Sequence, residues 1–198
     1  MKRWFFRILG KCIIRIFGWN VDQKLKEDFR RCVVVAAPHT SNFDFVIARA
    51  VFEEMKIPVR FTIKQEWTKG ILGWLLIELG AIGIDRRPKD KQSQPVSYVD
   101  AMANLFETNK ELAVLITPEG SRSRQVNWKT GFYYVAKLAG VPIGLGYLDY
   151  KSKTAGIGMV IWPGDDMAAD MKKIMAFYQD KYPKYPAKFS LDERYIPD

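Results

Sequence analysis

The chain has 198 residues, 48% of them hydrophobic and 27% charged, which is typical of one globular domain with a sizeable core. Its formal charge of +9 favours anionic partners such as phospholipid surfaces, phosphorylated substrates or nucleic acid. Two cysteines, Cys12 and Cys32, without metal-ligand spacing argue against a disulfide framework and indicate a reducing compartment. The single histidine excludes a multi-histidine metal site, and we expect no bound metal.

Basic residues recur every four positions in residues 1–19, with aromatic and aliphatic residues between them: Arg3, Arg7, Lys11 and Arg15. At 100° per residue these bases gather on one side, which predicts a basic amphipathic helix. We interpret residues 1–20 as a membrane-interface anchor; the alternative is a terminal helix packed on the domain. No apolar run reaches the roughly 18 residues of a spanning helix, and no cleavable signal is evident. We therefore expect a peripheral protein at the cytoplasmic face of the membrane.

The hydrophobic pattern predicts the remaining elements in order. A short charged helix over residues 21–29 precedes a strand over 32–37, a helix over 43–55, a strand over 59–63 and a helix over 68–79. A helix over 94–108, a strand over 112–117, a helix over 131–138, strands over 143–150 and 155–161, and a helix over 165–182 follow. This alternation favours an α/β fold, a single domain over residues 21–182 with a mainly parallel central sheet flanked by helices. Residues 183–198 would form an irregular tail.

His39, the only histidine, follows the first buried strand, and Asp44 comes five positions later. Pro38 ends the strand, and Ser41 or Asn42 can cap the next helix. Two helical positions five apart would diverge by about 140°, so His39 must lie in the loop if it meets Asp44. The carboxylate could then hold one imidazole nitrogen while the other faces a substrate. The alternative is a histidine with only a surface or packing role.

A second polar loop follows the strand over 112–117, with the sequence Pro118-Glu119-Gly120-Ser121-Arg122-Ser123-Arg124. Guanidinium groups, hydroxyls and backbone N–H groups at the carboxyl end of a strand can bind an oxyanion or a phosphate. A third loop, Asp85-Arg86-Arg87, is also basic. Three loops of complementary chemistry indicate a site more strongly than any one of them.

At these loops the chain resembles the glycerolipid acyltransferases, the family of bacterial 1-acylglycerol-3-phosphate acyltransferase. Residues 39–44 match the H-x-x-x-x-D motif of that family, and residues 80–86, 118–123 and 141–143 resemble its next three blocks in order. Residues 129–133 also resemble its short bacterial members. The resemblance covers roughly residues 30–165. The chain departs from the family pattern at Gly83 and Thr117, where an aromatic residue is usual, and at residues 144–146, where the usual end is apolar and contains proline.

The resemblance implies transfer of a fatty acyl group from acyl-CoA or acyl carrier protein to a lysophospholipid hydroxyl, without any other cofactor. The expected acceptor is 1-acylglycerol-3-phosphate, giving phosphatidate; another lysophospholipid or a lyso-aminolipid remains an alternative. His39 would act as general base, and Asp44 would orient it. The acceptor-binding residues would be Arg86, Glu119, Gly120, Ser121 and Arg122.

Two other classes of function fit the sequence less well. A serine hydrolase is disfavoured because neither Ser41 nor Ser121 lies in a G-x-S-x-G elbow. A non-catalytic basic module that binds membranes or nucleic acid is compatible with the charge and the six tryptophans. Because no stretch resembles a nucleic-acid-binding motif, we expect an anionic membrane surface as partner and no nucleic acid.

Overall fold

The computed structural model describes residues 3–84 and 97–196, with side chains from residue 6 onward. Its helices are α1 (Arg3–Ile16), α2 (Asn42–Glu54), α3 (Gly70–Glu78), α4 (Tyr98–Thr108), α5 (Gly131–Ala139) and α6 (Met167–Gln179). Its strands are β1 (Asn20–Asp22), β2 (Arg31–Ala36), β3 (Val59–Lys64), β4 (Ala81–Ile84), β5 (Leu112–Ile116), β6 (Ile143–Asp149) and β7 (Thr154–Ile161). Short 3-10 helices are η1 (Gln65–Thr68), η2 (Pro186–Lys188) and η3 (Glu193–Tyr195).

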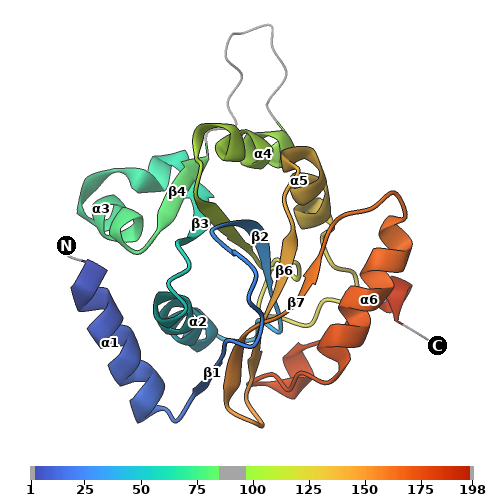
Figure 1. Cartoon of the computed structure of the whole chain (residues 1–198), viewed down its shortest axis with the longest axis horizontal. Coiled ribbons are helices and arrows are strands. Elements are labelled where there is room, and N and C mark those ends of the chain that lie inside the picture. Colours follow the sequence, from blue (N-terminus) through green and yellow to red (C-terminus); the bar gives the residue numbers. More distant parts are fainter. Residues whose placement is uncertain (1–2, 85–96, 197–198) are drawn as a thin grey trace, which may run out of the picture.

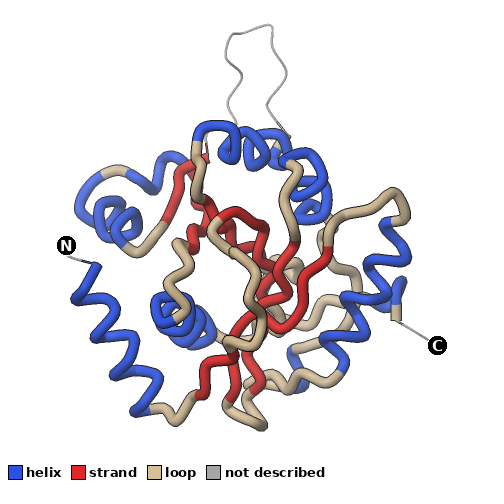
Figure 2. The backbone as a smooth tube through the Cα atoms, in the orientation of Figure 1, coloured by secondary structure: helices blue, strands red, loops and turns tan. Residues whose placement is uncertain are grey.

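The described strands form one sheet in the order β1-β7-β6-β2-β5-β3-β4. The pairings are parallel except that of β6 with β7, which is antiparallel. Helices surround the sheet, and the strands lie at the centre of the molecule (Figures 1 and 2). The predicted α/β fold with a mainly parallel sheet and an amino-terminal helix is therefore confirmed.

The two faces of the sheet are covered by different helices. In β2, Val33 and Val35 pack with α4, α5 and α6, whereas Cys32 and Val34 pack on the opposite side with Phe52 of α2. Because successive side chains of a strand point to opposite faces, a strand buried on both faces is a continuous apolar run. The run over 32–37 was predicted as a buried strand for this reason.

Two strands were not predicted, because each is short and depends on a distant partner. Residues 21–29, predicted as a charged helix, instead begin within β1, whose residues pair with Thr154, Ala155 and Gly156 of β7. Among the described strands, β4 pairs with β3 alone and is the last strand of the sheet. Four or fewer residues carry too little periodicity to distinguish a strand from a loop. The first residues of the predicted helix 94–108 lie outside the described residues.

The amino-terminal helix α1 packs against α2. Gly10 allows this close approach, since a Cβ atom there would lie 3.3 Å from the carbonyl oxygen of Ala50. Ile13 and Ile14 pack with the same small core, while Ile8, Leu9 and Ile16 remain exposed. The helix therefore both packs on the domain and retains an exposed apolar side.

Within the described residues, no helix combines the length and the apolar character needed to cross a bilayer.

The carboxyl-terminal segment is largely irregular and is held against the domain by the buried Asp192. This carboxylate accepts a hydrogen bond from the Trp128 backbone N–H (3.1 Å) and forms an ion pair with Arg194 (2.7 Å). The boundaries at residues 20 and 182 remain predictions.

Candidate active site

The loop between β2 and α2 is fixed by a capping box at the start of the helix. Ser41 is the N-cap residue, and Asp44 occupies the third helical position. The Oδ2 atom of Asp44 accepts hydrogen bonds from the backbone N–H groups of Thr40 and Ser41, both at 2.8 Å. These bonds satisfy donors that the helix start would otherwise leave unpaired. They also fix the position of the carboxylate.

The structure brings His39 and Asp44 together. The Nδ1 atom of His39 lies 3.4 Å from Oδ2 of Asp44, and this contact leaves the Nε2 atom for another partner. Burial alone would raise the pKa of Asp44, but hydrogen bonds from His39, Tyr150 and the Ser41 and Thr40 backbone lower it below its usual value. Asp44 is therefore a carboxylate at neutral pH and can hold the Nδ1–H tautomer of the imidazole.

Tyr150 is a third member of this cluster and was not predicted. Its hydroxyl donates a 2.6 Å hydrogen bond to Oδ1 of Asp44. Its ring packs edge-to-face with Trp19, with the ring centroids 4.9 Å apart. Burial and the contact with Asp44 raise the pKa of the Tyr150 hydroxyl, which keeps it a neutral donor. The residue lies just after β6, and no local sequence signal connects it with the histidine motif.

Glu119 lies behind the histidine loop. Its Oε1 atom accepts a 2.7 Å hydrogen bond from the His39 backbone N–H, and its buried Oε2 atom has no hydrogen-bond partner among the described residues. Burial raises the pKa of Glu119 to about 8, and the nearby charge of Asp44 contributes, although the hydrogen bond from His39 opposes the shift. Glu119 is thus mostly protonated at neutral pH and supports the backbone that carries the imidazole.

A cavity of about 640 Å³ opens beside His39 and Asp44. Apolar side chains of α2 and of the sheet form its inner wall: Phe45, Ala48, Val51, Phe52, Phe61, Leu115 and Leu148. Polar lining residues include Asn42, Thr117 and Lys129. The imidazole therefore lies at a boundary between polar groups and an apolar space large enough for part of a lipid chain.

The turn after β5 contributes backbone and a cation to this cavity. Gly120 has a φ of +67°, a conformation that favours glycine, and it lines the cavity. A Cβ atom at this position would lie 2.8 Å from the Nζ atom of Lys129, so the lysine side chain crosses directly over the glycine. Lys129 was noted in the sequence only as part of a resembling stretch, and the structure places it in the site.

The other predicted residues of this turn lie outside the cavity lining. The guanidinium of Arg122 donates a hydrogen bond to Oδ1 of Asn42, which joins the turn to the start of α2. The Ser121 hydroxyl contacts that of Ser123 at 2.9 Å and accepts a hydrogen bond from Gln125. Ser121 therefore stabilises the turn in which it lies. Arg122 lies exposed beside the histidine loop.

The third predicted loop, which contains Arg86, lies outside the described residues. Just before it, Gly83 explains one departure from the family pattern. A Cβ atom there would lie 2.2 Å from Oε1 of Gln65 and 2.7 Å from the Thr68 side chain. The η1 helix therefore occupies the space that a larger side chain at position 83 would need.

The described residues contain no cluster of three or more His, Cys, Asp or Glu side chains able to hold a metal ion. Cys12 is exposed and Cys32 is buried, and both are free. Burial raises the pKa of the Cys32 thiol to about 12, so it is a poor nucleophile and a poor metal ligand.

The mainly parallel sheet, the histidine–aspartate pair and the adjoining apolar cavity can be compared with known proteins. The family model described as Acyltransferase matches residues 20–144, and the chain belongs to this family. The resemblance predicted from the motifs is thus confirmed at the level of the family.

A solved structure with a similar fold is that of the 1-acyl-sn-glycerophosphate (LPA) acyltransferase PlsC from Thermotoga maritima. The TM-score is 0.60 at 14% sequence identity, and the alignment covers 92% of this chain and 81% of that chain. At this identity the likeness establishes the fold. A search of curated proteins finds no match.

Proposed function

We propose that this protein transfers a fatty acyl group from acyl-CoA or acyl carrier protein to the hydroxyl of a lysophospholipid. The observation that carries the proposal is the 3.4 Å contact between His39 and Asp44 at a cavity with a largely apolar wall. Membership in the Acyltransferase family and the fold shared with PlsC support the same reaction.

In the proposed mechanism, Nε2 of His39 accepts the proton of the acceptor hydroxyl as its oxygen attacks the thioester carbonyl. Such general base catalysis typically contributes about 10² to 10⁴ in rate. Asp44 holds the Nδ1–H tautomer and stabilises the imidazolium. The tetrahedral intermediate then collapses, the carbon–sulfur bond breaks, and the thiolate takes the proton from Nε2. Atoms and charge balance without a covalent acyl-enzyme.

We assign the inner apolar wall of the cavity to a fatty acyl chain, because Phe45, Phe52 and Phe61 offer it no polar partners. Lys129 lines the same cavity, and Arg122 lies exposed near its histidine loop, so both can meet an anionic head group. This arrangement favours 1-acylglycerol-3-phosphate, whose phosphate monoester is strongly anionic. Arg86 remains a predicted phosphate ligand. Glu119 would act through the His39 backbone, and Gly120 by leaving room for Lys129.

The membrane is the proposed place of action, since both the lysophospholipid and its product are lipids. The exposed apolar residues of α1, with exposed Arg7 and Arg15, suit an anionic interface. We accordingly propose a peripheral protein on the cytoplasmic face of the membrane. Nucleic acid is not a proposed partner.

The test is thiol release from acyl-CoA in the presence of lysophosphatidate, measured for the wild type and for His39→Ala. Because Cys12 is exposed, both chains should carry Cys12→Ser so that the protein thiol does not react with the assay reagent. We expect His39→Ala to lose at least about 10²-fold in rate while vesicle binding stays intact. Unchanged turnover would refute the assignment of the general base.

The acceptor requires a separate experiment. The purified chain is offered a panel of lysophospholipids, a lyso-aminolipid and an uncharged monoacylglycerol, with both donor types, and the products are identified by mass. The proposal expects acylation of lysophosphatidate. Exclusive acylation of the uncharged acceptor would contradict a role for the cationic side chains in acceptor binding.

A further inference from the structure

Helix α3 and the η1 turn before it expose an unusually apolar surface. We define the α3 patch as the exposed large side chains of this segment: Trp67, Ile71, Leu72, Trp74, Leu75 and Ile77. Ile71 is 88% exposed, Leu72 67% and Trp67 62%. Monomeric soluble proteins rarely expose contiguous apolar surface of this kind unless it contacts a partner or a membrane.

The exposure of the patch follows from how α3 is attached. Gly73 is the buried residue of the helix, and a Cβ atom there would lie 2.2 Å from the Thr68 backbone carbon, so α3 folds back on η1 at this glycine. At the other end, the Leu79 carbonyl oxygen accepts a 3.1 Å hydrogen bond from Nε of Arg49 on α2. The helix is thus fixed at both ends, and its large apolar side chains remain outside.

The position of the patch relates it to the candidate active site. The η1 turn follows the carboxyl end of β3, and His39 follows the carboxyl end of β2. Because β2 and β3 are both parallel to β5, their carboxyl ends lie on the same side of the sheet. Phe61 and Thr62, near the end of β3, line the cavity. In the view of Figure 1, α3 also lies on the same flank of the molecule as α1.

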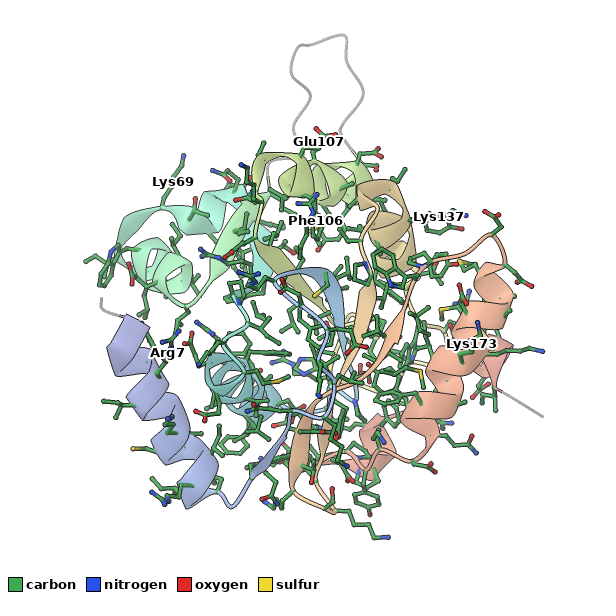
Figure 3. The ribbon with its side chains drawn as sticks, viewed as in Figure 1. Arg7, Lys69, Phe106, Glu107, Lys137 and Lys173 are labelled. Atoms are coloured by element: carbon green, nitrogen blue, oxygen red, sulfur yellow. The ribbon has the colours of Figure 1, made fainter. Side chains whose placement is uncertain are left out.

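The exposed residues of and around the patch favour a lipid surface as its partner. Lys64 and Lys69 are exposed on either side of η1, Glu66 is exposed within it, and Lys69 points outward in Figure 3. Tryptophan prefers the membrane–water interface, because its ring is apolar while its N–H group is polar. Lysine side chains attract anionic lipid head groups. Together with the chain's net charge of +9, these residues favour an anionic bilayer as the occupant.

We propose that the α3 patch inserts into the interface of an anionic phospholipid bilayer and forms a membrane contact separate from α1. A protein bound through this patch would face the lipid with the carboxyl ends of its parallel strands, where His39 lies. The choice of a lipid surface rests in part on the proposed function, since a lysophospholipid acceptor would enter from the bilayer. Binding of the patch to a bilayer can be measured without acyl transfer.

The experiment measures sedimentation of the full chain with vesicles of phosphatidylcholine and phosphatidylglycerol. The variant is Ile71→Glu with Leu72→Glu, which changes two highly exposed side chains. We expect partitioning to fall at least about tenfold, because apolar insertion is lost and carboxylates repel the anionic surface. The matched control adds the same two charges on α5, as Tyr134→Glu with Leu138→Glu at side chains 48% and 62% exposed, and it should lose much less binding.

A second pair of variants avoids introducing charge. Trp67→Ser should weaken vesicle binding, whereas Trp162→Ser, at a tryptophan 66% exposed after β7, should not. Equal partitioning of the α3 variants and the wild type would overturn the proposal. So would a change from dimer to monomer in sedimentation velocity without loss of vesicle binding, because the patch would then be covered by a second copy.

Failure of this inference can be distinguished from failure of the proposed function. With a short-chain lysophosphatidate that is monomeric in solution, Ile71→Glu with Leu72→Glu should keep wild-type turnover, while turnover on vesicle-embedded acceptor falls with binding. A wild-type chain that binds vesicles through the α3 patch but transfers no acyl group would refute the proposed function and leave the membrane contact standing. Loss of turnover on the monomeric acceptor would contradict a role limited to membrane binding.

Discussion

Asp44 illustrates at the residue scale how one side chain can serve both the fold and the site. Its Oδ2 atom caps α2 and contacts the imidazole, while its Oδ1 atom accepts the Tyr150 hydroxyl. A carboxylate held by several donors has little freedom to rotate, so the imidazole beside it is oriented before substrate binds. The sequence predicted that Ser41 or Asn42 would cap the helix, but it gave no sign of the tyrosine, which lies 106 positions from Asp44.

Tyr150→Phe tests whether this orientation matters for turnover. Removing a hydrogen bond to a charged group typically costs about 1.5 to 3 kcal/mol, so we expect kcat to fall about 10- to 100-fold with KM little changed. The control is Tyr133→Phe, which removes the 2.9 Å hydrogen bond from a buried tyrosine to Asp170, away from the site. If both variants lower thermal stability but neither lowers kcat, Tyr150 has only a structural role.

Glu119 gives a prediction on pH. Its pKa is raised from 4.5 to about 8 in the folded chain, so between these values the folded state holds a proton that the unfolded state releases. The unfolded state then binds fewer protons, and the contribution of Glu119 to the free energy of unfolding falls as pH rises through this window. Chemical denaturation across the window should show a smaller decline for Glu119→Gln than for the wild type.

The control for this measurement is Glu107→Gln, at an exposed position of α4, which should leave the pH dependence unchanged. Glu119→Gln should also keep most turnover, because its amide oxygen can still accept the hydrogen bond from the His39 backbone, whereas Glu119→Ala should lose it. A wild-type slope in Glu119→Gln would show that the buried carboxyl does not titrate as described.

At the scale of elements, the sequence predicted those whose signal is local. The strand β2 and the helix α2 follow from a continuous apolar run, a proline and a capping serine. The strands β1 and β4 did not follow, since their residues become strands only by pairing with β7 and β3. For the same reason, the burial of Glu119 could not be read from its turn, which looks polar and exposed in sequence.

The helix α2 also yields a prediction about the acyl chain, because its Ala48 lines the apolar wall of the cavity. Ala48→Phe would fill part of that space, although such overpacking can also destabilise the core. We expect kcat/KM for palmitoyl-CoA to fall at least about tenfold relative to octanoyl-CoA. Ala168→Phe, at an exposed position of α6, should not alter this ratio. An equal loss for both donors would contradict an acyl path beneath α2.

The whole molecule carries a net charge of +9, and its exposed bases should contribute to membrane binding beyond the α3 patch. Each base near an anionic leaflet contributes about 1 kcal/mol, so Arg7→Gln with Arg15→Gln should weaken binding to anionic vesicles roughly 30-fold. Binding to neutral vesicles should change little. The control, Lys110→Gln with Lys172→Gln, makes the same change in charge on exposed bases of other elements. Equal weakening by both pairs would mean that net charge alone governs binding.

The central claim is that His39 activates a lipid hydroxyl for attack on an acyl thioester. The most direct measurement incubates the chain with isotopically labelled acyl-CoA and lysophosphatidate and identifies the products by mass. We expect labelled phosphatidate with the wild type and none above the enzyme-free blank with His39→Ala. Labelled phosphatidate formed equally by both chains, or labelled free fatty acid as the sole product of the wild type, would contradict it.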